Sequence, residues 1–577
     1  MPKMNAMDAV VSILHDEGVD AVFGIPGAGI LPLYKALSKA PQIRNVTVRH
    51  EEGATHAADG WARATGKVGV ALGTSGPAGT NMVTGLYTAM ADSIPIITIT
   101  GQVPRSQLHR EGFQAVDICS IVKPVVKASF LVMEPTQIPG IFREAFRIAR
   151  EGRPGPVHID LPLDVQKAEI NYDPSTDGPL AVQKVEPNIA AIDKAIDLIR
   201  AAKHPILLAG GGVIIANASE TLVKFAEKMQ MPVALTLMGW GSIPADHPLC
   251  VGTVGIQTQT RAANKIFLES DLVVAVGARF AERHTGALDV YTKGREFIQI
   301  DIEPTQIGRI LEPALGIVSD AQTALTALLN SAERKMADAS APTAWASYAE
   351  EICRTVGRKM DLETSPIHPA RVFKEVNEEF DKDTIFTTAI GLYQIWSGQF
   401  QQSYRPRHYL VCGQAGPLGW EIPAAMGVKQ AFPEKEVVAI VGDYSFQFLM
   451  EEIAVGVQYK LPFVMVMLNN AYLGLIRQSE IGYDMNFGVD ISYENTEGWG
   501  IDHVKVVEAM GAKGVRVKEP SEIRGALQWA RQTVKSENIP VLVEIYIDRE
   551  ANAAMGGSLD QVREYSPTFD LVPAHTV

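Results

Sequence analysis

Cysteine is scarce in this sequence, with four residues among 577. They are Cys119, Cys250, Cys353 and Cys412. None of them forms a CxxC pair, and zinc and redox sites are built from closely spaced cysteines, so the sequence supports neither kind of site. We therefore expect all four to be buried free thiols.

Long apolar runs are also missing. No run reaches the roughly 18 residues that a membrane-spanning helix needs, so we expect no such helix. Asp8, Asp16 and Glu17 interrupt any signal-peptide core near the N-terminus. These absences predict a cytoplasmic protein.

Positive charge is outnumbered: 52 lysines and arginines stand against 66 aspartates and glutamates, which gives a net charge of −14. Binders of nucleic acid or anionic membranes normally carry a basic field, so we expect neither kind of partner. An anionic substrate would need a local cluster of positive side chains to overcome the global repulsion. Glycine and proline occur at ordinary levels, which excludes a collagen-like or low-complexity chain.

Short apolar segments alternate with helical patterns along most of the chain. The clearest predicted strands are residues 21–23, 46–48, 68–72, 94–99, 205–208, 385–388, 437–441 and 463–468. Alternation of this kind is typical of βαβ units, so we predict an α/β fold of three doubly wound parallel-sheet domains. The predicted domains are residues 1–180, 188–332 and 360–550, and a C-terminal arm follows at 551–577.

The strongest chemical signal lies in the third predicted domain. Asp443 directly follows one predicted strand, and Asn470 follows the next. Because the carboxyl ends of parallel strands share one edge of a sheet, both side chains should lie where such sheets bind ligands. Carboxylate and amide oxygens suit Mg²⁺. The alternative is a pair of ordinary turn residues.

Three glycine-rich turns follow other predicted strands, at residues 24–29, 73–79 and 210–212. None matches GxxxxGK[ST], so a P-loop ATPase is unsupported. The turn at 210–212 weakly suggests dinucleotide binding, and tight turns or packing glycines are the alternative in each case. Glu51 at a helix start is equally consistent with a favourable first-turn charge, and Arg279 and Arg283 with solvated surface charge.

Taken together, these residues resemble the thiamine-diphosphate-dependent carboligase family over about residues 4–550. The segment from Gly442-Asp443 to Asn469-Asn470 matches the family's thiamine diphosphate and Mg²⁺ signature. The resemblance implies that Asp443, Asn470 and the carbonyl of Tyr472 hold Mg²⁺. Tyr444 stands where the generic pattern has glycine. The residues implied to contact thiamine diphosphate are Pro26, Gly27, Thr74, Gly416, Leu418, Gly442, Asp443, Tyr444, Ser445, Asn470, Leu473 and Gly474.

The same resemblance implies four catalytic residues. Glu51, in Arg-His-Glu, matches the position that activates the cofactor's pyrimidine ring. Leu418, in Gly-Pro-Leu-Gly, matches the bulky residue that holds the cofactor in a V shape. Gln114 matches a glutamine that faces the active site, and Arg283 matches an arginine implicated in binding the acceptor carboxylate.

The middle domain resembles the FAD-binding domain of the same subset, in which the flavin takes no part in the net reaction. Arg153 matches a flavin-contacting arginine. The residues implied to bind FAD are Arg153, Gly210, Gly211, Gly212, Thr236, Leu237, Met238, Gly277, Arg279, Asp301, Ile302, Asp320 and Ala321.

Within the family, segments 238–241, 279–286, 301–309, 412–420 and 469–478 are similar to those of glyoxylate carboligases. Ser479 stands where acetolactate synthases usually carry tryptophan. The resemblance implies decarboxylating condensation of two molecules of glyoxylate, a small anionic 2-oxo acid, to tartronate semialdehyde by a homodimer or homotetramer. Glu51 departs from this pattern, because glyoxylate carboligases have valine there and acetolactate synthases have glutamate.

Three alternatives stay open at this point. An acetolactate synthase would use pyruvate as donor. A flavin oxidoreductase of the pyruvate-oxidase kind would share both cofactors but reduce the flavin during turnover. A nicotinamide dehydrogenase would explain residues 210–212 and leave the pair Asp443 and Asn470 unexplained.

Overall fold

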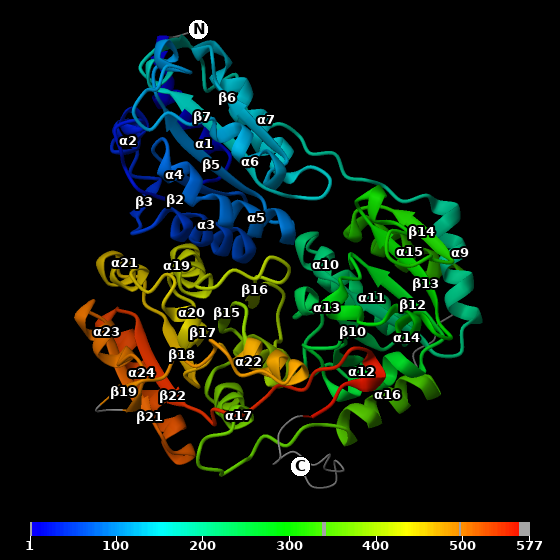
Figure 1. The fold of residues 1–577 in the computed structure, drawn as a ribbon. Helices are drawn as coiled ribbons and strands as arrows, with labels where there is room; N and C mark the ends of the chain where they lie inside the picture. The colour runs from blue at the N-terminus through cyan, green and yellow to red at the C-terminus, as the bar shows by residue number, and fades with distance from the viewer. Residues whose placement is uncertain (1–2, 337–341, 496–497, 565–577) are drawn as a thin grey trace.

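The computed structural model describes residues 3–336, 342–495 and 498–564, which form three α/β domains (Figure 1). Each domain contains a six-stranded sheet whose neighbouring strands are all parallel. Many strands are buried along their whole length because helices cover both faces of the sheets. The predicted fold class is therefore confirmed.

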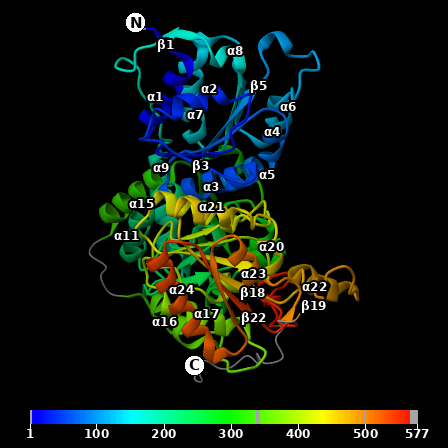
Figure 2. The same cartoon turned by 90° about the vertical axis from the view of Figure 1, so that its left-hand side faces the viewer.

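The N-terminal domain lies above the other two in both views (Figures 1 and 2). Its sheet has the order β3-β2-β4-β5-β7-β6. The strands are β2 (Ala21–Gly24), β3 (Arg44–Thr47), β4 (Gly69–Gly73), β5 (Ile96–Gln102), β6 (Ala128–Leu131) and β7 (Val157–Pro162). The helices are α1 (Ala6–Asp16), α2 (Leu31–Leu37), α3 (Glu51–Thr65), α4 (Pro77–Asn81), α5 (Val83–Asp92), α6 (Ile118–Val122), α7 (Ile138–Arg150) and α8 (Leu163–Gln166). A short antiparallel pair, β1 (Lys3–Asn5) and β8 (Glu169–Asn171), joins the start of the domain to its end.

The middle domain has the sheet order β11-β10-β9-β12-β13-β14. Counted along the chain this is 3-2-1-4-5-6, the order of dinucleotide-binding folds. The strands are β9 (Pro205–Ala209), β10 (Val233–Leu235), β11 (Cys250–Thr253), β12 (Leu272–Val276), β13 (Glu296–Asp301) and β14 (Leu315–Val318). The helices are α9 (Ile189–Ala201), α10 (Gly211–Ile215), α11 (Ser219–Met229), α12 (Arg261–Glu269), α13 (Glu282–Thr285), α14 (Leu288–Thr292), α15 (Ala321–Lys335) and α16 (Ala344–Thr355).

The C-terminal domain has the order β16-β15-β17-β18-β22-β21. The strands are β15 (Ile385–Thr388), β16 (Tyr409–Val411), β17 (Val437–Gly442), β18 (Val464–Asn469), β21 (Lys513–Val517) and β22 (Val541–Tyr546), with a hairpin of β19 (Glu494–Asn495) and β20 (Gly498–Trp499). The helices are α17 (Pro369–Glu379), α18 (Leu392–Phe400), α19 (Glu421–Ala431), α20 (Asp443–Phe446), α21 (Glu452–Tyr459), α22 (Gly474–Glu480), α23 (His503–Ala509) and α24 (Ile523–Glu537). Counted from its first sheet strand, this domain repeats the 2-1-3-4-6-5 order of the N-terminal domain.

Two segments outside the predicted domain limits pack on the middle domain. Helix α16 buries Trp345 and Ile352 in the core that contains Phe267. From the predicted C-terminal arm, Leu559 enters the same core, and the Gly556 N–H donates to the Ile256 carbonyl (3.1 Å). The remainder of the predicted arm, residues 565–577, lies outside the described residues.

The N-terminal and C-terminal domains meet where α3 packs against α19, and small residues let the helix backbones approach closely (Figure 1). A Cβ added at Gly60 would lie 2.5 Å from the Ala424 carbonyl oxygen, and one at Gly427 would lie 2.0 Å from that of Ala57. This contact fixes the axis of α3, and therefore the position of its first residue, Glu51.

Two predictions made from what the sequence lacks, concerning membrane-spanning helices and cysteines, can be compared with the structure. Of the described residues, no helix is long and apolar enough to cross a membrane. All four cysteines are free thiols, but only Cys412 is buried. The other three are partly exposed, so the prediction of four buried thiols was wrong for them; burial depends on tertiary packing that spacing along the chain does not reveal.

Candidate active site

Asp443 and Asn470 lie side by side at the carboxyl edge of the C-terminal sheet. They follow β17 and β18, which are neighbouring strands, and the Asn470 N–H points to Asp443 Oδ1 at 3.4 Å. Both side chains are buried, and burial raises the pKa of Asp443 to about 6. The strand order changes direction between β15 and β17, so Asp443, at the end of β17, borders the topological switch point where open α/β sheets bind ligands, and Asn470 ends the next strand.

Glycines allow the segments at this edge of the sheet to pack closely together. A Cβ at Gly474 would lie 2.7 Å from Asn470 Nδ2, so α22 can begin against that amide only with glycine. A Cβ at Gly442 would lie 2.6 Å from the ring of Tyr393. The N–H of Tyr472 donates to Asn470 Oδ1 (3.3 Å). Leu473 precedes α22, and its N–H donates to the Val489 carbonyl (2.9 Å).

The loop at residues 412–420 lies against the same edge. Gly416 has a φ of +64°, a conformation that favours glycine, and Leu418 follows it, partly exposed. The N–H of Gly419 donates to Ser445 Oγ (2.8 Å), which ties the loop to the turn that carries Asp443. Tyr444, the departure from the family pattern, packs its ring edge-on against Phe448.

Glu51 is the first residue of α3, and its carboxylate accepts a hydrogen bond from a neutral side chain: Asn81 Nδ2 donates to Glu51 Oε2 (2.9 Å). Glu52 points elsewhere, with Oε1 3.4 Å from His56 Nε2. The start of α3 is held from the C-terminal domain, because Glu452 Oε1 accepts the backbone N–H groups of residues 49 and 50, each at 3.0 Å. Burial raises the pKa of Glu452 to about 7.

The two glycine-rich turns of the N-terminal domain lie together at its own switch point, between β2 and β4. Thr74 Oγ1 accepts the Gly29 N–H (3.1 Å), and a Cβ at Gly27 would lie 2.6 Å from the Thr74 side chain. Pro26 belongs to the same turn. Gln114, with a φ of +60°, packs on this region, since a Cβ at Gly76 would lie 2.9 Å from the Gln114 Cβ.

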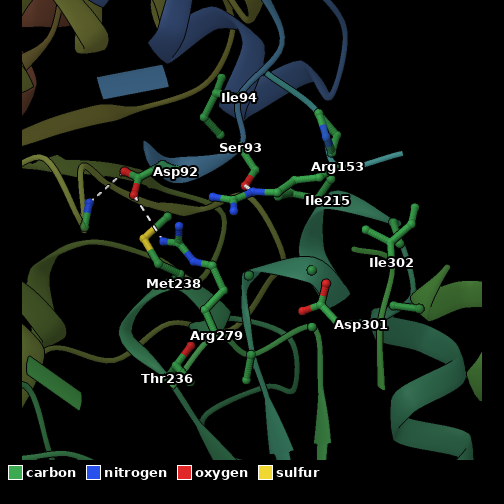
Figure 3. A pocket seen from close by; sticks show the side chains of 18 of the residues that line it. Asp92, Ser93, Ile94, Arg153, Ile215, Thr236, Met238, Arg279, Asp301 and Ile302 are labelled. Carbon is green, nitrogen blue, oxygen red and sulfur yellow. Dashed lines mark hydrogen bonds and ion pairs between the residues drawn. The ribbon is translucent and has the colours of Figure 1, made fainter. Parts of the chain in front are cut away.

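A cavity of about 620 Å³ opens between the carboxyl edge of the middle sheet and the other two domains (Figure 3). Of the residues predicted to bind FAD, Gly210 alone does not line it; a Cβ at Gly210 would lie 2.1 Å from the Gly277 carbonyl oxygen, so this glycine packs against the turn at Gly277. The predicted residues that line the cavity are Arg153, Gly211, Gly212, Thr236, Leu237, Met238, Gly277, Arg279, Asp301, Ile302, Asp320 and Ala321.

Positively charged side chains line the cavity, although the net charge of the whole chain is negative. Arg153, Arg279 and Arg283 all line it. Arg283 Nε donates to the side-chain oxygen of Gln257 (2.7 Å), and no carboxylate of the described residues forms an ion pair with its guanidinium. Burial lowers the pKa of Arg283, but arginine stays charged at neutral pH. A cation without an acidic partner beside a cavity can bind a carboxylate or phosphate.

Asp92, which ends α5, joins the three domains at one fully buried carboxylate. It accepts the N–H groups of Gly413 (2.8 Å) and Gln414 (3.0 Å) from the C-terminal domain, and Arg63 Nη2 from its own domain (3.0 Å). Arg279 of the middle domain approaches to 3.8 Å. Figure 3 shows Arg153 and Arg279 reaching the turn at Asp92 and Ser93 from two sides.

Comparison with protein families decides what this architecture is. The sequence matches three descriptions in chain order: the thiamine pyrophosphate enzyme N-terminal TPP binding domain over residues 4–121, the central domain over 192–328 and the C-terminal TPP binding domain over 389–545. The chain belongs to the thiamine pyrophosphate enzyme family.

Curated members of the thiamine pyrophosphate enzyme family are similar over nearly the whole chain. A glyoxylate carboligase of Escherichia coli O157:H7 is 49% identical over 578 residues, which cover 99% of this chain and 98% of the relative. A probable acetolactate synthase large subunit of Methanocaldococcus jannaschii is 39% identical, covering 94% and 92%. The acetolactate synthase large subunit of Corynebacterium glutamicum is 36% identical, covering 98% and 92%.

In this thiamine pyrophosphate enzyme the predicted cofactor residues form two separate groups within one chain. Gly27, Glu51 and Thr74 lie in the N-terminal domain, and Asp443 and Asn470 lie in the C-terminal domain. Among the described residues, no hydrogen bond or ion pair joins the first group to the second. We call the first group the N-terminal half-site and the second the C-terminal half-site.

Sequence reasoning missed several residues that the structure places at the site: Asn81 beside Glu51, Glu452 at the start of α3, Gln257 beside Arg283, and Asp92. Each makes its contact across a turn or a domain boundary. Asp92 and Gly413 are 321 positions apart in sequence. No local pattern marks such residues, although family-wide comparison of sequences could have singled them out.

Proposed function

We propose that this thiamine pyrophosphate enzyme is a glyoxylate carboligase, which condenses two molecules of glyoxylate to tartronate semialdehyde and carbon dioxide. The observation that carries the proposal is Arg283, a partly buried cation with no acidic partner among the described residues, which suits a small 2-oxo acid. The similarity of the entire chain to a glyoxylate carboligase supports it. The test is a product assay with glyoxylate, pyruvate and both together, in which tartronate semialdehyde is expected from glyoxylate.

The C-terminal half-site fits thiamine diphosphate with Mg²⁺. A buried carboxylate, an amide oxygen and a backbone carbonyl, from Asp443, Asn470 and Tyr472, are hard oxygen donors of the kind Mg²⁺ takes alongside phosphate oxygens. Thiamine diphosphate, when bound, would supply a carbon that adds to a carbonyl and a positively charged ring that accepts the electron pair released with carbon dioxide. Leu418 would hold the cofactor's two rings close together, and Glu51 would exchange a proton with the pyrimidine ring.

The large cavity fits FAD. Its volume accepts a dinucleotide, glycines 211, 212 and 277 line it, and Arg153 and Arg279 supply charge for a diphosphate. We propose that the flavin does not change redox state in the net reaction. A pyruvate-oxidase-like enzyme would instead bleach its flavin when substrate is added without oxygen, so an unchanged absorbance spectrum is the expected result.

Glu51 favours a second candidate, acetolactate synthase, because the family resemblance associates glutamate at this position with that activity. The structure supplies Glu51 with the hydrogen-bonded partner Asn81. Acetolactate formed from pyruvate, with no tartronate semialdehyde from glyoxylate, would favour this candidate in the same product assay.

The separation of the two half-sites predicts an oligomer. We expect at least a homodimer, and propose a homotetramer, in which the N-terminal half-site of one chain faces the C-terminal half-site of another. Large exposed apolar side chains near both half-sites support this, including Phe113 (87% exposed) beside Gln114 and Phe487 (81%) in the segment after α22. Light scattering under assay conditions measures the mass, and a fully active monomer would refute the expectation.

Replacing Arg283 with alanine is expected to lower carboligation at least about tenfold, because a charge-assisted hydrogen bond contributes roughly 1.5–3 kcal/mol. Decarboxylation should fall less, since the second substrate is the one that Arg283 would bind. Separate assays of carbon dioxide release and product formation measure the two steps. Arg309→Ala, at an exposed site in the same domain, is the control. Unchanged carboligation in Arg283→Ala would show that the guanidinium binds no substrate.

A further inference from the structure

A chain of buried polar side chains crosses the N-terminal domain between β5 and β7. Thr98 Oγ1 lies 2.8 Å from His158 Nδ1, and Thr100 Oγ1 lies 3.1 Å from His158 Nε2. Thr100 Oγ1 lies 2.7 Å from Asp160 Oδ1. Gln102 continues the chain, because its Nε2 donates to Asp160 Oδ2 (2.9 Å). None of these five side chains is more than 2% exposed, so water does not compete for their hydrogen bonds.

The direction of each hydrogen bond follows from chemistry. Burial lowers the pKa of His158 to about 3, so the ring is neutral and carries one N–H. Ionised Asp160 only accepts, so Thr100 must donate to it. The Thr100 oxygen then accepts His158 Nε2–H, and the bare Nδ1 accepts the Thr98 hydroxyl proton. Every polar atom that links the chain is thereby satisfied.

At the far end of this chain, the Gln102 amide contacts both ends of one loop. The Val103 N–H, where the loop begins, donates to Gln102 Oε1 (2.9 Å). Gln102 Nε2 also donates to the Val116 carbonyl, where the loop ends (2.8 Å). The loop between them, residues 103–116, carries Gln114. One buried amide therefore closes the base of the loop, and Asp160 fixes the orientation of that amide.

We propose that Gln102 is a positioning residue, which together with its anchor Asp160 closes the loop 103–116 and so holds Gln114 at the N-terminal half-site. The inference rests on the proposed function and on the family resemblance, which implies that Gln114 faces the active site. Gln102 touches neither substrate nor cofactor in this account and acts only through the loop.

The hydrogen bonds by which Gln102 closes the base of the loop tolerate a change in the charge of Asp160. Burial raises the pKa of Asp160 to about 7, and the other titratable groups facing it are His158, Asp117 and Cys119, none of them a cation at neutral pH. When Asp160 gains a proton at Oδ1, it donates to Thr100, Thr100 donates to His158 Nε2, and the ring donates from Nδ1 to Thr98. Both donations from Gln102 stay in place. Asp160→Asn reproduces this reversed chain.

Two isosteric variants, Gln102→Glu and Asp160→Asn, therefore test the proposal in the full-length enzyme. In Gln102→Glu an acceptor replaces Nε2 and faces the Val116 carbonyl and the Asp160 carboxylate, so the loop base opens. We expect kcat for carboligation to fall at least about tenfold, since misplacing an active-site group by about 1 Å costs roughly 100-fold. Activity should recover partly as pH falls, because a proton shared between the introduced carboxylate and that of Asp160 removes the repulsion. Asp160→Asn should stay within about twofold of the unmodified enzyme at each pH.

Trypsin cleavage after the exposed Arg110 gives a readout that needs no activity. We expect faster cleavage in Gln102→Glu and in Gln102→Asn, a shorter neutral variant that serves if Gln102→Glu does not fold, and an unchanged rate in Asp160→Asn. Unchanged cleavage in the Gln102 variants, a pH profile of Gln102→Glu parallel to that of the unmodified enzyme, or faster cleavage without loss of kcat would each overturn the proposal. If the unmodified enzyme forms no carboligation product, the proposed function fails, and the cleavage rates still decide whether Gln102 closes the loop.

Discussion

Replacing Asp443 with alanine is expected to abolish carboligation and thiamine diphosphate binding while the protein keeps its FAD. The carboxylate is buried beside Asn470, so it is the charged oxygen donor available to Mg²⁺ at this edge of the sheet. Even residues that only support metal ligands typically change metal affinity or activity by about 10–100-fold, so loss of the charged ligand itself should exceed about 100-fold. Binding of thiamine diphosphate is measured by calorimetry in the presence of Mg²⁺.

Flavin retention separates this loss from general unfolding. The cavity proposed for FAD lies between the middle domain and the other two, and Asp443 does not line it, so the visible flavin spectrum should persist. Asp443→Asn is the matched variant, because it keeps the size of the side chain and removes only its charge. Full activity of purified Asp443→Ala at ordinary cofactor concentrations would contradict the metal assignment.

Replacing Glu51 with valine is expected to slow hydrogen–deuterium exchange at the reactive carbon of bound thiamine diphosphate by at least about tenfold. Positioned acid–base groups contribute roughly 10²–10⁴-fold, and the family resemblance implies valine at this position in glyoxylate carboligases, so we expect the effect to lie near the bottom of that range or below it. The reason is local: Glu51 begins α3 and is oriented by Asn81, so its carboxyl group has a defined direction. Carboligation of glyoxylate should fall less if another step limits turnover.

Glu52 provides the control for this experiment, since it is the same residue type one position along the same helix. Its carboxylate lies 3.4 Å from His56 instead of beside Asn81. Glu52→Gln should therefore leave the exchange rate close to that of the unmodified enzyme. Equal exchange in Glu51→Val and the unmodified enzyme would mean that Glu51 does not activate the cofactor.

The sequence predicted those parts of the molecule that depend on local order along the chain. The alternation of apolar segments with helical patterns was sufficient to predict three parallel sheets, because few other folds produce this alternation. The meeting of Asp443 and Asn470 followed from strand direction alone, since successive parallel strands end at one edge. The clustering of Arg153 with Arg279 around a cavity needed the family resemblance in addition, because the two residues come from different domains.

Contacts between distant segments could not be predicted in this way. Nothing near Asn81 indicates that its amide meets Glu51, because the contact depends on how α4 packs beside α3. Helix α16 lies between the predicted limits of the second and third domains, and residues 556–559 lie in the predicted C-terminal arm, yet both pack on the middle domain. The apolar residues of α16 follow a helical period, but that pattern does not indicate which domain the helix packs against, and only the finished core shows it.

The junction at Asp92 has a consequence for attempts to recombine domains among related enzymes. Its carboxylate comes from the first domain, the two amides it accepts from the third, and an approaching guanidinium from the second. A chimaera that imports a foreign third domain keeps the anion but requires the incoming backbone at positions 413 and 414 to meet it. A fragment lacking that domain leaves the anion with Arg63 and Arg279 as its remaining partners among the described residues. Chimaeras whose crossover points separate Asp92 from its partners are therefore expected to fold poorly. Chimaeras that transfer Asp92 and its partners together should fold.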